Sequence, residues 1–119
     1  MNRLEIALEQ KRSGETLFAV LRVGGFVEVS TEDEFRNGMN DGIQQVLQEQ
    51  VSALILSFED LSYINSTGLA VVVDANRQLV EKFALASVPD SVIQIAKLLG
   101  LDEQLNVFET VDEALEALS

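Results

Sequence analysis

The sequence predicts one α/β domain over residues 1–119, in which a single mixed β-sheet packs against about four helices. Three observations lead to this fold class. The length of 119 residues is typical of one domain, and 47% of the residues are hydrophobic, which is enough to fill a core. The first segments alternate apolar and polar residues around a turn, as an antiparallel hairpin does. From residue 31 on, helical spacing alternates with short apolar runs, as in parallel β-α-β units, so the predicted order is β-β-α-β-α-β-α-β-α.

The opening hairpin consists of two predicted strands and the turn between them. Large apolar residues alternate with other residues in 3–10, so this segment is expected to be a half-buried strand. Residues 12–15 (RSGE) have turn chemistry, and residues 16–23 (TLFAVLRV) form the second strand. We expect the Gly24-Gly25 pair to break this strand and residues 26–29 to be short and extended.

The next segment changes to helical spacing. Two overlapping capping boxes, Ser30 with Asp33 and Thr31 with Glu34, mark the start of a helix over residues 31–49. Acidic residues in this first turn also suit the positive end of a helix dipole. The apolar side chains that we expect to face the core recur at helical spacing: Phe35, Met39, Ile43, Val46 and Leu47.

The middle of the chain is predicted to hold the central strands. Residues 52–58 (SALILSF) form a continuous apolar run, which is typical of a strand buried on both faces. We expect a loop at 59–65, a helix at 66–81 and a further buried strand at 83–88.

The predicted helix at 66–81 is amphipathic. Asn76 falls on its inward side, where a hydrogen bond to the backbone is the expected role. The residues expected to face the core are Leu69, Val72, Val73, Leu79 and Val80. The residues expected to form an exposed stripe are Thr67, Ala70, Val71, Asp74, Gln78 and Glu81.

The C-terminal part is predicted to contain two short helices and a short strand. A helix begins at Pro89-Asp90-Ser91 and ends at Gly100, a C′ glycine, and residues 106–108 form a strand. Thr110 with Glu113 caps the last helix. After Lys97 every charged residue is acidic, which we interpret as a solvated face, with a docking site for a basic partner as the alternative. These acids are Asp102, Glu103, Glu109, Asp112, Glu113 and Glu116.

Charge and composition exclude several classes of function. A net charge of −12 argues against binding nucleic acid or an anionic membrane. Because the chain has neither cysteine nor histidine, disulfides, thiolate catalysis, Ser–His–Asp triads and imidazole metal sites are excluded. A chain without cysteine fits a reducing cytoplasm. No segment has the apolar length of a signal peptide or a membrane-spanning helix.

Asn65-Ser66-Thr67-Gly68, which opens the second helix, is the segment most expected to carry function. In open α/β sheets, ligands gather at the carboxyl ends of strands and at the helix starts that follow. A phosphoryl group on Ser66 or Thr67 would be tolerated there, because free N–H groups and the helix dipole favour negative charge. The small and apolar residues of the exposed stripe suit docking of a protein partner. The simpler alternative is that Asn65 or Ser66 only caps the helix.

At these segments the sequence resembles the STAS-domain family, specifically the bacterial anti-sigma factor antagonists. The resemblance covers nearly the whole chain and rests on the order and spacing of three motifs. Family members usually carry Asp-Ser-Ser-Gly or Asp-Ser-Thr-Gly and then Leu, where this chain has Asn65 to Leu69, with Asn in place of Asp. The other motifs are Gly25-Phe26-Val27-Glu28 and Leu99-Gly100-Leu101-Asp102, the latter followed by Val107-Phe108 and Glu113-Ala114-Leu115. The family often has a Gly just before the strand at 83–88, where this chain has Glu81-Lys82.

The resemblance implies a phosphorylation switch at Ser66. In the family, the second residue of the motif is phosphorylated by a partner Ser/Thr kinase, which is itself the anti-sigma factor. The unphosphorylated protein binds this kinase and frees a sigma factor, and a metal-dependent Ser/Thr phosphatase resets the phosphorylated form. By position, the implied partner contacts are Asn65, Ser66, Thr67, Gly68, Ala70, Val71 and Asp74, with Phe26, Val27 and Glu28. The resemblance implies a cytoplasmic protein with no catalytic residue and no cofactor.

Two other functions stay open at this point. The first is a STAS module that acts as a scaffold or sensor in another signalling or transport complex without being phosphorylated. The second is a small enzyme or nucleotide binder in which Glu28, Glu59, Asp60 and Asp74 hold Mg²⁺. The chain has no GxxxxGK[ST] loop to cradle a phosphate, which argues against the second.

Overall fold

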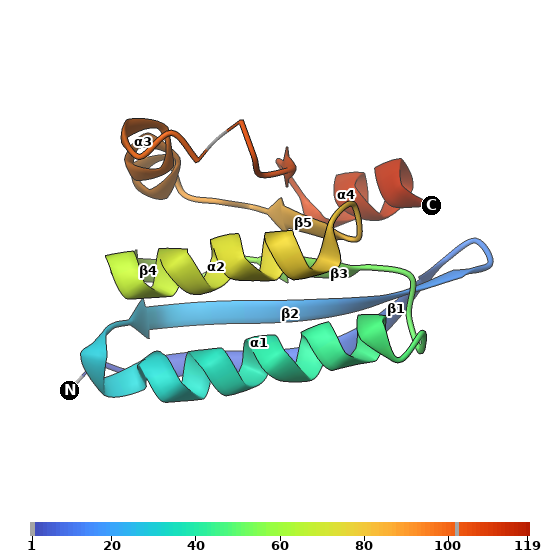
Figure 1. Cartoon of the computed structure of the whole chain (residues 1–119), viewed down its shortest axis with the longest axis horizontal. Helices are drawn as coiled ribbons and strands as arrows, with labels where there is room; N and C mark the ends of the chain where they lie inside the picture. The colour runs from blue at the N-terminus through green and yellow to red at the C-terminus, as the bar shows by residue number, and fades with distance from the viewer. Residues whose placement is uncertain (1, 102) are drawn as a thin grey trace.

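The computed structural model describes residues 2–101 and 103–119 and shows one mixed β-sheet with helices on both faces (Figure 1). The strand order is β1-β2-β3-β5-β6, and β4 pairs with β2 beyond β3. β1 is antiparallel to β2, whereas all the other pairs are parallel. The strands are β1 (Leu4–Ser13), β2 (Thr16–Val27), β3 (Leu54–Ser57), β4 (Leu61–Ile64), β5 (Phe83–Ala86) and β6 (Val107–Phe108). The helices are α1 (Glu32–Leu47), α2 (Ser66–Leu79), α3 (Asp90–Leu98) and α4 (Val111–Leu118), with a 3₁₀ turn, η1 (Val29–Thr31), before α1.

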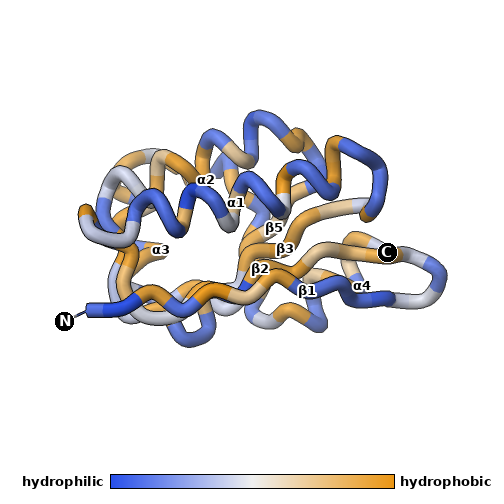
Figure 2. The backbone as a smooth tube through the Cα atoms, turned by 90° about the horizontal axis from the view of Figure 1, so that it is seen from below, coloured by the Kyte–Doolittle hydropathy of each residue, from blue (hydrophilic) through white to orange (hydrophobic). Residues whose placement is uncertain are grey.

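The predicted fold class is confirmed, and the sheet separates two cores. α1 and α2 lie side by side on one face, and α4 lies on the other (Figures 1 and 2). Since side chains alternate along a strand, Leu21 of β2 enters the larger core under α1 and α2, and Val20 enters the smaller core under α4. All four residues of β3 are buried, as the apolar run predicts. Among the described residues, no helix combines the length and the apolar character that a bilayer crossing requires.

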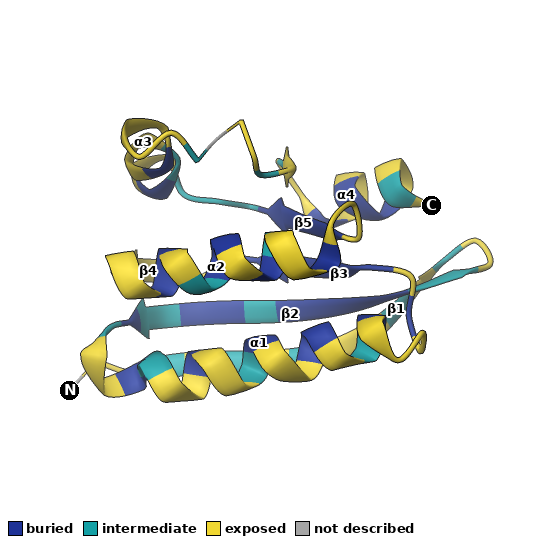
Figure 3. Ribbon diagram, in the orientation of Figure 1, coloured by how far each residue is buried: buried dark blue, intermediate teal, exposed yellow. Residues whose placement is uncertain are grey.

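The outer faces of α1 and α2 are exposed along their length (Figure 3). Four of the five predicted core residues of α1 are buried, and Leu47 is instead about half exposed, at 52%. α2 begins at Ser66, as predicted, but ends at Leu79, two residues before the predicted end. As a result Val80, predicted to face the core, is 70% exposed.

The start of α1 differs from the predicted capping boxes, which are wrong. Thr31 is the N-cap residue, but its hydroxyl makes no cap bond to the helix. That hydroxyl donates to the Phe26 carbonyl oxygen at 2.7 Å and accepts the Glu28 N–H at 3.0 Å. The Ser30 hydroxyl donates to the Glu28 carboxylate at 3.3 Å. Thr31 therefore holds the loop after β2 instead of capping α1.

The Gly24-Gly25 pair does not break β2, which continues to Val27. The register shifts between Gly25 and Phe26, and Gly25 has φ +80°. A Cβ atom on Gly25 would lie 2.2 Å from the Arg3 carbonyl oxygen, so only glycine fits this close approach. The pair marks a bulge inside a long strand rather than its end.

Part of the predicted loop at 59–65 is a strand, β4. It runs parallel to the end of β2, with Phe26 opposite Tyr63 and Val27 opposite Ile64. Leu61 and Ile64 are buried under α2, and the two residues between them are exposed. A strand of four residues is too short to produce a clear alternation in the sequence.

The two helix caps predicted in the C-terminal part of the chain are confirmed. Gly100 has φ +71°, and the Leu101 N–H donates to the Ala96 carbonyl oxygen at 2.8 Å, as in a Schellman motif. The Thr110 hydroxyl accepts the Glu113 N–H at 3.1 Å at the start of α4. The acids predicted to form a solvated face are exposed, except that Asp102 lies outside the described residues.

Candidate functional site

The site is built around the start of α2. Asn65 follows β4 with extended backbone, and its side-chain oxygen accepts the Gly68 N–H at 2.8 Å. Its own N–H donates to the Val27 carbonyl oxygen at 2.9 Å, which anchors the turn to the end of β2. Ser66 and Thr67 follow on the first turn, and both are exposed. Of the two residues considered as the cap, Asn65 caps the helix, and the Ser66 side chain is left open to solvent.

Gly68 allows the first turn of α2 to lie directly on the sheet. A Cβ atom at this residue would lie 2.7 Å from Cγ1 of Ile64 and 2.7 Å from Cγ1 of Val27. Both of those side chains are buried and β-branched, so neither can move aside easily. Gly68 is itself buried and shapes the site from beneath.

The two predicted contact segments lie next to each other in the fold. Phe26 and Val27 pair with Tyr63 and Ile64, the residues just before Asn65. The starts of α1 and α2 lie at the same end of the sheet, beyond the carboxyl end of β2 (Figure 1). Residues some 40 positions apart in the sequence therefore share one surface.

The structure separates the predicted contact residues by exposure. Val27 is fully buried and Gly68 is buried, so both support the surface without presenting a side chain on it. Four of the others are exposed: Ser66, Thr67, Ala70 and Asp74. Four are half-buried: Phe26, Glu28, Asn65 and Val71.

The exposed stripe of α2 forms one wall of a shallow groove of about 290 Å³. Thr67, Ala70, Val71 and Asp74 line it from α2, and Arg36 is among the residues that line it from α1. Val71, predicted to be exposed, is half-buried because it also packs against the main core. Thr67 on the first turn of α2 lines the groove, so the groove begins one residue from Ser66.

Asn65 also connects the two helix starts. Its side-chain nitrogen donates to Oε1 of Glu32, the first residue of α1, at 2.9 Å. Both side chains are half-buried. The Asn that stands here in place of the family's usual Asp therefore has a hydrogen-bond partner in this chain, Glu32.

The chain is similar to known proteins over nearly its whole length. The sequence profile of the STAS domain matches residues 7–114. The chain belongs to the STAS domain family. An anti-sigma F factor antagonist from Paenibacillus polymyxa is 24% identical over 116 residues, which cover 98% of this chain and 93% of that relative.

Solved structures share the fold of this STAS domain. An anti-sigma factor antagonist from Mycobacterium paratuberculosis has a TM-score of 0.78 at 20% identity, covering 98% of this chain and 94% of that one. The Bacillus cell fate determinant SpoIIAA in its phosphorylated form has a TM-score of 0.66 at 21% identity, covering 95% and 100%. The predicted resemblance to the anti-sigma factor antagonists is thus confirmed.

Sequence reasoning missed three exposed residues beside the site of this STAS domain. Val29 in η1 is 83% exposed, Tyr63 on β4 is 48% exposed, and Arg36 lines the groove. Val29 directly follows the predicted segment and carried no motif signal. Tyr63 was assigned to a loop, and the place of Arg36 depends on how α1 packs against α2.

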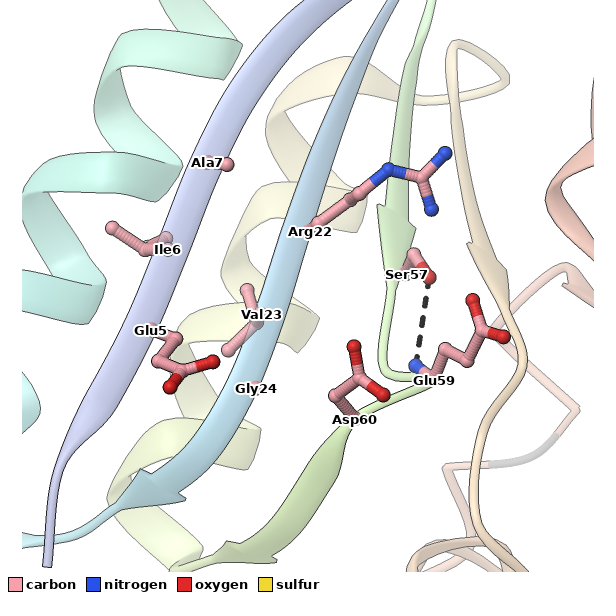
Figure 4. Close-up of a pocket in the computed structure, with 9 residues that line it drawn as sticks. All are labelled: Glu5, Ile6, Ala7, Arg22, Val23, Gly24, Ser57, Glu59 and Asp60. Carbon is pink, nitrogen blue, oxygen red and sulfur yellow. Dashed lines mark hydrogen bonds between the residues drawn. The ribbon is translucent and has the colours of Figure 1, made fainter.

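The sheet face of the STAS domain that points away from α1 and α2 has a separate polar depression of about 250 Å³ (Figure 4). Arg22 and Ser57 line it with Glu59 and Asp60, and Arg22 pairs with Glu9 at 2.9 Å. The Ser57 hydroxyl accepts the Glu59 N–H at 3.5 Å.

The acids considered for Mg²⁺ do not gather at this depression. Glu59 and Asp60 line it, whereas Asp74 lines the groove on α2 and Glu28 lies in the loop before α1. In residues 2–101 and 103–119, no group of three or more carboxylates is arranged to hold a metal ion.

Proposed function

We propose that this STAS domain is an anti-sigma factor antagonist whose partner binding is switched by phosphorylation of Ser66. One observation carries the proposal: Ser66 is exposed on the first turn of α2, directly after the Asn65 cap, in a chain similar to anti-sigma factor antagonists. One structural relative is described in a phosphorylated form, so modification occurs on this fold.

The start of α2 suits a reversible charge. A phosphoryl group brings about −1.5 to −2 charge and three acceptor oxygens. At a helix start, free N–H groups and the dipole stabilise that charge by about 0.3–1 kcal/mol. Since the Ser66 side chain faces solvent, no core contact has to break. The fold is therefore expected to persist while the surface changes.

The surface around Ser66 suits a protein partner. The groove along α2 combines small, apolar and polar side chains, and Val29 and Tyr63 add exposed apolar area near the helix start. Up to two further negative charges on Ser66 would lie one residue from Asn65, which bonds to Glu32 in the acidic first turn of α1. A partner that docks here would meet a more repulsive and more strongly hydrated surface after phosphorylation.

In the proposed cycle, the unphosphorylated domain binds an anti-sigma factor Ser/Thr kinase in the cytoplasm and so frees a sigma factor. The kinase phosphorylates Ser66 and the complex dissociates, and a Ser/Thr phosphatase restores the binding form. The domain itself performs no catalysis and uses no cofactor in this cycle.

Affinity capture from the native host's lysate tests the proposal with three baits. They are the wild type, Ser66→Glu, and Ser91→Glu as the control, since Ser91 is also exposed and near a helix start, that of α3. We expect the wild type and Ser91→Glu to recover a kinase of the histidine-kinase-like ATPase fold, and Ser66→Glu to lose it. Equal recovery of the same proteins by all three baits would instead mean that Ser66 has only a structural role at the helix start. The domain would then be a constitutive scaffold.

A further inference from the structure

The Asn65 side chain makes two hydrogen bonds that join elements far apart in the sequence. Its oxygen accepts the Gly68 N–H at 2.8 Å, within α2. Its nitrogen donates to the Glu32 carboxylate at 2.9 Å, at the start of α1. The first bond fixes the rotamer of Asn65, and the second ties that rotamer to α1.

The two bonds need a donor and an acceptor on one side chain, which the amide of Asn65 provides and a carboxylate does not. An aspartate would cap the Gly68 N–H as well as asparagine does. It has no N–H to offer Glu32, however, and would place two carboxylates within hydrogen-bond distance, where like charges repel. The identity of Asn65 is therefore explained by Glu32 rather than by the cap of its own helix.

Ser66 has little else to determine its position. Within the described part of the chain, the Ser66 hydroxyl makes no hydrogen bond, and its side chain is exposed. Its place in space thus depends on the backbone of the first turn, which begins at Asn65. In the phosphorylation step, the Ser66 hydroxyl oxygen attacks the γ-phosphorus of a nucleoside triphosphate held by the kinase, the nucleoside diphosphate leaves, and the hydroxyl proton passes to a base of the kinase. Because the attacking oxygen must be in line with the phosphorus, a misplacement of about 1 Å can lower the rate by about 100-fold.

We propose that Glu32 is a positioning residue for the phosphorylation of Ser66, and that it acts through the side-chain amide of Asn65. This inference rests on the proposed function of the site. Glu32 and Asn65 form a matched carboxylate–amide pair, and the pair replaces the usual Asp of the motif in this chain. The property that matters is the acceptor oxygen at residue 32, not its charge.

Four variants separate these properties. Glu32→Gln keeps an acceptor oxygen of the same reach without the charge, and Glu32→Ala removes the acceptor. Asn65→Asp keeps the cap on Gly68 but opposes Glu32. The double variant Glu32→Gln/Asn65→Asp reverses the pair, because the amide introduced at residue 32 can donate to the carboxylate introduced at residue 65.

The measurement is the initial rate of Ser66 phosphorylation by the kinase recovered with the wild-type bait, with kcat and KM determined separately. We expect Glu32→Ala to lower kcat about tenfold or more with little change in KM, because the Ser66 hydroxyl is misplaced while the predicted contact residues are kept. Asn65→Asp should lower kcat to a similar extent, and its KM is not part of the test because Asn65 is itself a predicted partner contact. Glu32→Gln should keep kcat within about threefold of the wild-type value, and the double variant should recover most of the kcat that Asn65→Asp loses. Thermal unfolding of each variant confirms that it is folded at the assay temperature.

Three results would overturn the inference. Glu32→Ala at the wild-type kcat would mean that the hydrogen bond positions nothing. Glu32→Gln as slow as Glu32→Ala would mean that the kinase recognises the charge. Asn65→Asp faster than the wild type would mean that the motif needs its acid at residue 65.

A readout on the domain alone separates this failure from failure of the proposed function. Solvent exchange of the Asn65 side-chain amide, followed by NMR, should be slow in the wild type and Glu32→Gln and fast in Glu32→Ala. Fast exchange in the wild type would disprove the hydrogen bond between Asn65 and Glu32, independently of the result of the kinase assay. A slow amide with Ser66 left unmodified by the kinase would reject the switch and, with it, the positioning role.

Discussion

The two ends of α2 are built in opposite ways. At its start, Asn65 caps the helix and bonds to Glu32, and Gly68 lets the first turn lie on β2 and β4. At its end, Val80 has φ 55° and ψ −113°, a backbone conformation that strains a β-branched residue. The Val80 side chain is 70% exposed, so burial does little to offset the strain.

This difference shows where the chain tolerates change. At the start of α2, the Asn65 side chain has two hydrogen-bond partners and Gly68 packs closely on the sheet, so a substitution of either residue disturbs the fold and the surface around Ser66 together. At the end of α2, the backbone has the shape that glycine favours, but the chain has valine. The first end should therefore lose stability on substitution and the second should gain it.

Gly68→Ala should break the well-matched end most strongly. The new Cβ atom would lie 2.7 Å from buried side-chain atoms of Val27 and Ile64, and we expect a loss of about 2–3 kcal/mol in the free energy of unfolding. Urea denaturation measures this loss. Thr67→Ala, at an exposed neighbour, is the control and should change stability by less than about 0.5 kcal/mol. A Gly68→Ala cost no larger than that of Thr67→Ala would disprove the close approach.

Asn65→Ala sharpens the comparison with a second helix start. Thr110 also caps a helix through a side-chain oxygen, at 3.1 Å from the Glu113 nitrogen, but no bond to another helix involves its side chain among the described residues. Thr110→Ala should cost about 1 kcal/mol. Asn65→Ala should cost up to about 2 kcal/mol, because it also leaves Glu32 without its donor. Equal costs in urea denaturation would show that the bond to Glu32 adds no stability.

The sequence predicts the elements well where their spacing is long and regular. The apolar run at 52–58 and the helical spacing in 31–49 both lead to the elements that the structure shows. The Gly24-Gly25 pair misleads, because its role depends on the distant Arg3 carbonyl group. β4 is missed for the same reason, since Tyr63 is held in a strand by pairing with Phe26.

The candidate site is predicted only where a local motif exists. The motif places Ser66 correctly on an exposed first turn, because a cap and a helix start can be predicted from neighbouring residues. The burial of Val27 and the groove position of Arg36 follow from how β2, α1 and α2 pack together. The bond from Asn65 to Glu32 spans 33 positions, and no local pattern encodes it.

Val80→Gly should strengthen the poorly matched end of α2, with the smallest effect of the three. A residue in a sparsely populated backbone region costs about 1–3 kcal/mol, and glycine removes most of that cost. Glycine also has more freedom in the unfolded chain, which offsets about 0.4–1 kcal/mol of the gain. With a strain cost in the lower half of the first range, we expect urea denaturation to show a net rise of about 0.5–1 kcal/mol in the free energy of unfolding.

Val29→Gly is the matched control for this prediction. Val29 is also exposed, at 83% against 70% for Val80, but its φ is not positive, so glycine relieves no strain there and should lower stability or leave it unchanged. If both variants lose stability to the same extent, the backbone at Val80 carries no strain. If only Val80→Gly gains stability, then α2 has a strained backbone at its end and a fully hydrogen-bonded Asn65 cap at its start. Because Val80 lies at the other end of α2 from Ser66, Val80→Gly should recover the same partner as the wild type in affinity capture.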